Sequence, residues 1–521
     1  MKTKKAYILA FCALVMPAMV MSENDETVSR AAYDSLLRRV EAIENAQRGG
    51  EAAHAGCCDA VDGQTGATRG NGGEKHDTGK KKKSKVVLGF NKEYKDNEDF
   101  TKFRVGGYGE MVASYMDYGP NRFNAPYGNY REEKGRISIP RFVLAGDYKF
   151  NRWFQLGAEI EFESGGTGST YEYETVTGSE NGEAEFEVEK GGEVALEQLH
   201  ITATIFRELN VRAGHIIVPV GLTNYRHEPV NFFGTRRPEG ETKIIPSTWH
   251  ETGLELFGSI GKGWYDFDYQ LQIVTGLTAD EFDRYEFVGV AKQGIFEEDN
   301  FSCPAYVARL NYNGVPGLRV GGSWYYLRDA GKNAIKPYKY YSLSLPVRLY
   351  SADAEYKNKY VTARANFLYG NVGNVDKLAK TAGFTGAKYT PIITSPSGML
   401  SGTIPYHEAV SYAGEVGINI GAFIPSKKPV KIMPFARYEY YNPQWKDDVK
   451  TSDPRTEVAM WTVGINWFAL PNLVIKADWT TRHFGTDNPF RDNGYVVKGT
   501  KINTENDLSI GIAYVGWFAK K

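Results

Sequence analysis

The chain has 521 residues, of which 24% are charged, yet its formal net charge is only −1. Because no block of basic charge lies within residues 103–521, the composition argues against nucleic acid as a partner. Four cysteines are too few to form a disulfide framework. After the N-terminal segment, no apolar run is long enough to cross a membrane as a helix.

Residues 1–22 have the pattern of a secretory signal peptide. Lys2, Lys4 and Lys5 precede the apolar run Ala6–Met21, and small residues near its end predict cleavage after Ser22. The alternative is a buried helix at the start of a cytosolic domain. The signal-peptide interpretation places the mature chain outside the cytoplasm.

Residues 23–48 are predicted to form a short periplasmic helix. Its apolar residues follow the a/d spacing of a coiled coil, at Tyr33, Leu36, Val40 and Ile43. About two heptads are marginal in isolation, so the helix needs a partner, either copies of itself or the main domain. The alternative is a helix that packs or frays without such a role.

Residues 49–102 are predicted to be a flexible linker rich in Gly and Lys. Its basic run at Lys80–Lys83 is either solvated or touches anionic lipid headgroups. The vicinal Cys57 and Cys58, with His54 nearby, fit incidental thiols or an interchain disulfide better than a metal site.

From residue 103 onward, segments alternate between apolar and polar residues with the period of a β-strand. In Arg152–Ser164 the apolar side chains fall on one face, and Glu159, Glu161 and Glu163 fall on the other. The same pattern puts Asp266 and Asp268 on a polar face. A barrel in a membrane turns its apolar face to lipid and its charged face to the lumen, so these five residues are predicted to face the lumen.

About sixteen such segments occur, and short links tend to alternate with long insertions. The predicted strands are 104–117, 136–149, 153–163, 194–206, 209–217, 251–260, 264–275, 304–313, 317–327, 343–356, 358–370, 408–423, 430–441, 456–468, 473–483 and 507–518. The alternation of short links with long insertions is typical of outer-membrane barrels. The expected fold class is therefore all-β: residues 103–521 form a transmembrane antiparallel barrel of about sixteen strands, and a short N-terminal periplasmic helix precedes it.

The long insertion within Pro219–Gly258 is rich in charge and interrupts the strand array. It is expected either to fold into the lumen as a constriction or to be an ordinary external loop. The constriction candidates are Arg226, His227, Glu228, Arg236, Arg237, Glu239 and Lys243, with Glu241 beside them. Known catalytic patterns are absent or weak, so the chain is expected not to be an enzyme and to need no cofactor and no metal.

Several short motifs resemble the outer-membrane porins grouped with the phosphate-selective porins O and P, particularly those of Bacteroidetes. They are V-G-G-Y-G-E at 105–110, P-R-F-V-L at 140–144, E-I-E-F-E at 159–163, E-Q at 197–198, P-V-G at 219–221, H-E-P at 227–229, R-P-E at 237–239 and I-I-P-S-T-W at 244–249. The resemblance covers roughly residues 103–276 and implies a porin barrel, commonly trimeric, that passes small anions or other small solutes. A phosphate-selective pore needs inward Arg and Lys, whereas the clearest inward faces of this sequence are acidic.

The sequence thus predicts a porin for passive diffusion of small hydrophilic solutes or ions, with anions such as phosphate as a narrower option. Its expected surroundings are the lipids of the outer membrane of a Gram-negative bacterium, and it is expected to form a homotrimer. The alternative is a barrel that serves as an anchor or binding partner for other envelope proteins.

Overall fold

The computed structural model describes residues 101–117, 133–164, 169–174, 185–190, 193–283, 285–293, 299–335, 340, 343–381, 406–425, 430–445, 456–485 and 504–521. The predicted signal peptide (1–22), the periplasmic helix (23–48) and the linker (49–102) up to residue 100 lie outside the described residues, as do Cys57 and Cys58. Among the described helices, none is long and apolar enough to cross a membrane.

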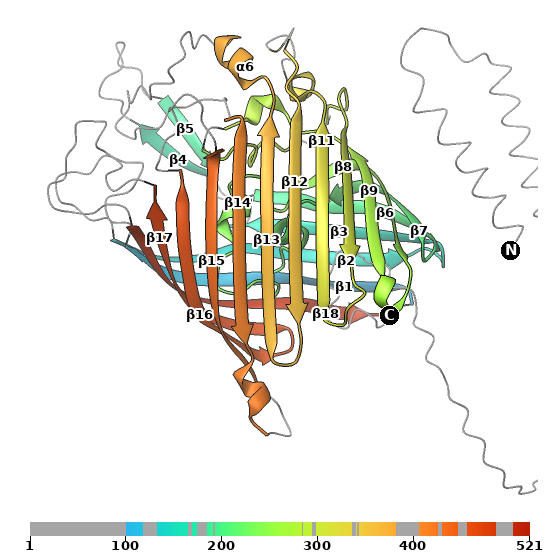
Figure 1. Cartoon of the computed structure of the whole chain (residues 1–521), viewed down its shortest axis with the longest axis vertical. Helices are drawn as coiled ribbons and strands as arrows, with labels where there is room; N and C mark the ends of the chain where they lie inside the picture. The colour runs from blue at the N-terminus through green and yellow to red at the C-terminus, as the bar shows by residue number, and fades with distance from the viewer. Residues whose placement is uncertain are drawn as a thin grey trace, which may run out of the picture. The chain divides into compact units, whose positions relative to one another are not determined.

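Sixteen described strands form one closed antiparallel barrel (Figure 1). They are β1 (Phe103–Asp117), β2 (Glu133–Lys149), β3 (Phe154–Glu163), β6 (Glu193–Phe206), β7 (Leu209–Ile217), β8 (His250–Ile260), β9 (Phe267–Val274), β10 (Ala305–Tyr312), β11 (Leu318–Leu327), β12 (Val347–Lys357), β13 (Val361–Val372), β14 (Glu408–Ile418), β15 (Lys431–Trp445), β16 (Val458–Leu470), β17 (Leu473–Phe484) and β18 (Thr504–Lys520). β1 pairs with β18, which closes the ring. The predicted all-β barrel is confirmed, because each of its sixteen strands pairs with a neighbour on both sides.

Two further strands, β4 (Ser169–Glu174) and β5 (Glu185–Lys190), form a separate hairpin in the connection between β3 and β6. Strand ends differ from the sequence prediction by a few residues. The largest difference is in β14, which ends at Ile418, whereas the sequence predicts a strand up to residue 423. Pairing stops there because Asn419 turns its side chain to the carbonyl of Lys359, and a 3₁₀ turn, η5 (Ile420–Phe423), follows.

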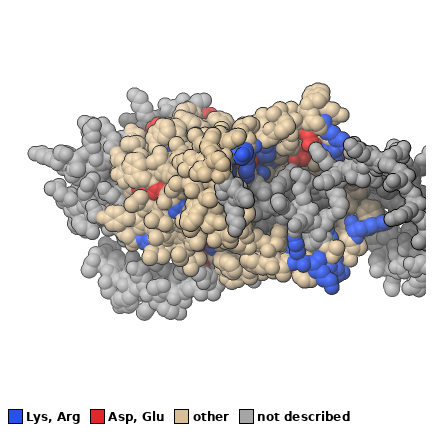
Figure 2. Space-filling model, turned by 90° about the horizontal axis from the view of Figure 1, so that it is seen from below, with Lys and Arg blue, Asp and Glu red and all other residues tan. Residues whose placement is uncertain are grey.

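Short and long connections alternate around most of the barrel, although the connections on either side of β15 each have 12 residues. The short ones, such as residues 207–208 and 471–472, lie at the same end as the start of β1 and the end of β18. The long ones, such as residues 218–249 and 373–407, lie at the other end, where helix α6 (Val375–Thr381) appears at the top of Figure 1. Seen from the short-connection end, most of the described surface is uncharged, and Lys and Arg side chains gather in a few patches (Figure 2).

The strands are inverted relative to a soluble protein: their apolar side chains point outward and their charged side chains point inward. On β3, Phe154 and Ile160 are exposed while Glu159 and Glu161 are buried. On β18, Leu508 and Ile510 are exposed while Asp507 and Ser509 are buried. The same order holds around the ring, with exposed Leu199, Ile201, Leu256, Leu271, Tyr306, Leu310, Trp324, Phe367, Val416, Trp461, Val463 and Ile465. An apolar outer band around a polar interior is the arrangement that a lipid bilayer requires.

The largest apolar cluster lies where the long connections meet the barrel. It joins Val218, Ile244 and Trp249 of the connection between β7 and β8 to buried residues of other connections, including Phe282 and Leu345. Burial of this kind holds long connections in fixed positions. It therefore sets where the connection between β7 and β8 enters the barrel.

Candidate functional site in the barrel lumen

The connection between β7 and β8, residues 218–249, folds into the barrel and is called the lumen segment below. Its two ends are adjacent, because the backbone N–H of Val218 donates to the carbonyl of Trp249 at 2.9 Å. Between them the segment contains two short helices, α4 (Leu222–Tyr225) and α5 (Glu239–Thr242). Nearly all of its residues are buried or half-buried.

The lumen segment crosses to the opposite wall of the barrel. Near its start, the backbone N–H of Gly221 donates to the Ser351 hydroxyl on β12 at 3.1 Å. Farther along, its carbonyls accept from Arg437 on β15, which lies across the ring from β7 and β8. A segment with partners on both sides of the ring occupies the interior, so it is not an external loop.

Wall side chains hold the backbone of the segment in place. The ammonium of Lys476 on β17 donates to the carbonyls of Pro229, Phe232 and Gly234 at 2.5, 3.3 and 2.6 Å. On the same strand, a carboxylate oxygen of Asp478 accepts from the backbone N–H of Thr235 at 2.6 Å. These bonds satisfy peptide groups that have no helix or sheet partner, which would otherwise be costly to bury.

Two polar side chains within the segment organise its entry. Asn224 donates to the carbonyls of Val218 and Val220 and accepts from the backbone N–H of Trp249. Glu241 accepts from the backbone N–H groups of Leu222 and Asn224 at 3.0 and 2.6 Å. Burial raises the pKa of Glu241 to about 7 even though these bonds favour its charged form. Glu241 thus serves the folding of the segment.

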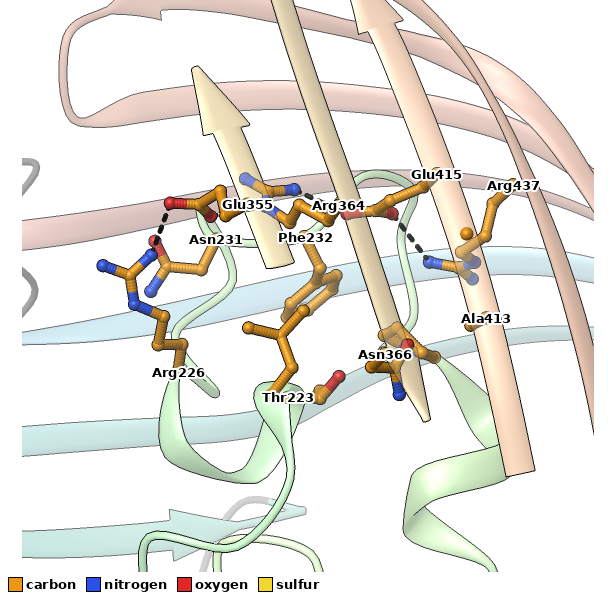
Figure 3. A pocket seen from close by; sticks show the side chains of 13 residues that line it. Thr223, Arg226, Asn231, Phe232, Glu355, Arg364, Asn366, Ala413, Glu415 and Arg437 are labelled. Atoms are coloured by element: carbon orange, nitrogen blue, oxygen red, sulfur yellow. Dashed lines mark hydrogen bonds and ion pairs between the residues drawn. The ribbon is translucent and has the colours of Figure 1, made fainter. Parts of the chain in front are cut away.

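The lumen wall carries a row of alternating charges, called the charge belt below. It runs Glu355 on β12, Arg364 on β13, Glu415 on β14 and Arg437 on β15, which are direct neighbours in the strand pairing. Arg364 lies 2.9 Å from Glu355 and 2.6 Å from Glu415, and Arg437 lies 3.8 Å from Glu415. Figure 3 shows these side chains side by side, with Arg226 of the lumen segment bound to Glu355.

The belt continues to β11 and β10 through Asp353. This carboxylate lies between Arg309, at 2.7 Å, and Arg319, at 3.0 Å, and the Arg309 and Asp353 side chains are fully buried. Arg309 also donates to the carbonyl of Pro219, so the belt supports the start of the lumen segment. Opposite charges on adjacent strands compensate one another, which makes their burial tolerable.

The structure separates the constriction candidates into two groups. His227 and Glu228 are buried, as is Glu241, and of these three only Glu228 also lines the cavity described below. His227 donates through Nδ1 to the carbonyl of Asn224, and burial lowers its pKa to about 3. Burial also raises the pKa of Glu228 to about 7, and Asn231 donates to its carboxylate at 2.6 Å.

The remaining candidates are more accessible. Among the residues of this segment that form ion pairs, Arg236 has the most exposed side chain, at 47%. It lies 3.4 Å from Asp507 of β18. Arg237 donates to Ser247 and Thr248, Glu239 pairs with Arg482, and Lys243 pairs with Glu286. Arg236 and Lys243 are therefore the candidates most open to solvent, whereas the side chains of Arg226 and Glu239 are only 14% and 19% exposed.

The predicted lumen-facing carboxylates also have different surroundings. Glu159 and Glu161 are buried inside the barrel, and Glu163 is exposed at the end of β3. Asp268 accepts from Ser259 and Asn313. Asp266 comes just before β9 and pairs with Arg207 at 2.9 Å, because the turn η1 (Gly263–Tyr265) replaces the start of the predicted strand.

A cavity of about 330 Å³ lies between the lumen segment and the short connections. Charged and polar side chains that line it include Arg212, Arg226, Glu228, Asp268, Arg319 and Glu355. The cavity also reaches residues 315–318 in the turn between β10 and β11. The space thus lies inside the strand ring, is lined by both charged and apolar side chains, and extends to the short-connection end.

Sequence reasoning missed the inward basic residues of the wall. Arg309, Arg319, Arg364, Arg437 and Lys476 all lie on inner faces of strands. Their positions at alternate places in apolar strands were a usable signal. The partners of these side chains could not be predicted from sequence, because each pair joins residues from different strands. The acidic residues predicted on β3 and β9 therefore account for only part of the charged groups in the lumen.

No protein-family model matches the chain. An uncharacterized protein of Aquifex aeolicus (strain VF5) is 28% identical over 221 residues, which are 42% of this chain and 43% of that protein. The match thus spans less than half of the length of this relative.

Solved structures with a similar arrangement include three outer-membrane proteins, each about 10% identical to this chain. OmpF of Salmonella typhi, solved in complex with daunomycin, has a TM-score of 0.46, with 79% of this chain and 97% of that chain covered. The outer membrane channel DcaP of Acinetobacter baumannii has a TM-score of 0.43, with 80% and 97% covered. OmpT of Vibrio cholerae has a TM-score of 0.42, with 80% and 99% covered. The resemblance to the phosphate-selective porins O and P stays a prediction from sequence.

Proposed function

We propose that this protein is a porin of the outer membrane of a Gram-negative bacterium, through which small hydrophilic solutes or ions diffuse passively. The observation that carries the proposal is the inverted barrel, apolar outside and charged inside, with a cavity lined in part by charged side chains beside an inserted segment. Sixteen-stranded barrels are wide enough to enclose an aqueous channel. The lumen segment is then the constriction of that channel.

The accessible charges of the lumen segment are proposed to set ion preference. Arg236, Lys243 and Arg226 supply positive charge, and each lies near a carboxylate of the wall or of another connection. Selective passage of phosphate is not part of the proposal, because the arginines of the charge belt pair with carboxylates. A homotrimer, with residues 23–48 associated as a short coiled coil, remains part of the proposal on the grounds of sequence.

Replacing Arg236 with Glu is expected to shift the reversal potential of the channel toward cation preference. The side chain is half exposed in the lumen, and reversing a charge at a narrow passage changes which ions enter it. The measurement is the zero-current potential of the purified protein in a planar bilayer under a salt gradient.

Lys262→Glu is the matched control, since Lys262 is an exposed residue of the short connection between β8 and β9. It makes the same charge change outside the lumen segment and should leave the potential unchanged. Equal shifts in both variants would contradict a constriction at the lumen segment. Absence of conductance in every variant, with folded barrels, would contradict the porin itself and would favour the alternative of an anchoring barrel.

A further inference from the structure

A group of buried potential metal ligands joins the lumen segment to the barrel wall. Glu159 of β3, Glu197 of β6 and His227 of the lumen segment each place one ligand atom within 4.8 Å of the other two. Glu161, two residues along β3, also interacts electrostatically with Glu197. Carboxylates from two strands and an imidazole from a third element therefore converge on one point.

A β-bulge puts Glu197 in this position. In the pairing of β3 with β6, Glu159 is opposite Gln198 and Ile160 is opposite Leu196, so Glu197 is the extra residue. Both Glu197 and Gln198 are consequently buried, although neighbouring residues of a regular strand would point to opposite faces. Bulges re-aim side chains in this way and often occur at functional sites.

The converging carboxylates have unused bonding capacity. Within the described part of the chain, Oε1 of Glu197 and Oε1 of Glu161 are buried without a donor, the two carboxylates lie against each other, and Glu197 is only 1% exposed. The hydroxyl of Tyr108 donates to the other oxygen of Glu197 at 3.2 Å. The nearby Arg141 binds Glu110 and the carbonyl of His227, and its charge partly compensates Glu197 and Glu161 although its Nη1 has no hydrogen-bond partner. Buried oxygens of this kind call for a cation or a proton.

The imidazole of His227 has the tautomer that a metal ligand requires. Its Nδ1 lies 3.0 Å from the carbonyl oxygen of Asn224. Since a carbonyl can only accept, Nδ1 carries the proton and Nε2 has the free lone pair. A backbone carbonyl behind the ring is the usual orienting partner of a metal-bound histidine.

We propose that Glu159, Glu197 and His227 bind a divalent transition-metal ion that clamps the lumen segment to the barrel wall. One nitrogen and two carboxylate oxygens suit Zn²⁺ and its neighbours, whereas Ca²⁺ and Mg²⁺ prefer oxygen ligands alone. Zn²⁺ bonds to nitrogen and oxygen at about 2 Å, so small side-chain rotations close the site around the ion. Glu161 or a water molecule completes the four-coordinate shell.

The test is equilibrium dialysis of the purified full chain in detergent, stripped with a chelator and then exposed to Zn²⁺. All proteins carry Cys57→Ser and Cys58→Ser, so that the vicinal thiols do not compete for the ion. The parent should retain one Zn²⁺ per chain, and Glu197→Gln and His227→Gln should each weaken retention by at least about tenfold. Zn²⁺ should also raise the unfolding temperature of the parent and not of these two variants.

Glu163→Gln is the matched control for Glu197→Gln, because it makes the same substitution at an exposed position on the neighbouring strand β3. It should bind Zn²⁺ as the parent does. Three results would overturn the proposal: no retained ion in a barrel that circular dichroism shows to be folded, equal retention in all variants, or Ca²⁺ bound as tightly as Zn²⁺. Neither readout depends on conductance, so failure here is separate from failure of the porin proposal.

Discussion

Removing the lumen segment is expected to raise the single-channel conductance severalfold. The variant replaces residues 222–247 with a four-residue Gly-Ser linker. The segment contacts strands on both sides of the ring, so its side chains fill space that a sixteen-stranded barrel would otherwise leave to water. A short linker can close the gap because Val218 and Trp249 are already hydrogen-bonded neighbours.

A point variant tests the same feature without a deletion. Lys476→Met removes the ammonium that binds three carbonyls of the lumen segment. The segment should then loosen, which predicts a conductance between those of the parent and the deletion variant, with larger current fluctuations. Lys359→Met, in the short connection between β12 and β13, should behave as the parent. Conductance unchanged in the folded deletion variant would show that the segment does not restrict the passage.

Neutralising Asp353 is expected to destabilise the barrel by about 3–5 kcal/mol. Its carboxylate lies between Arg309 and Arg319, and Asp353→Asn would leave two buried guanidinium groups facing each other without compensation. The measurement is chemical denaturation of the purified protein in detergent, followed by tryptophan fluorescence.

Asp266→Asn makes the same substitution at an accessible ion pair. Asp266 and Arg207 are each about one-third to one-quarter exposed, so water screens their attraction and the expected loss is at most about 1 kcal/mol. Adding Arg309→Met to Asp353→Asn should recover part of the lost stability, because it removes one of the two unpaired charges. Equal losses in Asp353→Asn and Asp266→Asn would contradict a structural role for the charge belt.

The barrel could be predicted from sequence because its signal is local. Alternation along residues such as Phe154–Glu163 reports two faces of one strand, and each of the predicted strands has a counterpart in the barrel. The outward position of Ile160 and the inward position of Glu159 follow from the period of two alone. The sequence analysis predicted no strand for the β4–β5 hairpin. This hairpin lies in the connection between β3 and β6 and pairs apart from the barrel.

The candidate site could be predicted only in part because its contacts join distant residues. Sequence left open whether the charged insertion folds into the lumen or stays outside the barrel, and it could not show that Glu241 caps backbone N–H groups within the segment. The pairing of Lys476 with carbonyls more than 240 positions away has no local pattern. The bulge at Glu197 also escaped, because it depends on the register between β3 and β6.

The most direct test of the central claim is solute flux through the unaltered protein. Liposomes that contain the purified barrel should swell in isotonic solutions of small neutral sugars, and swelling should slow as the sugar becomes larger. This result is expected if a water-filled passage runs beside the lumen segment. Swelling no faster than that of protein-free liposomes, with the barrel folded by circular dichroism, would contradict the account.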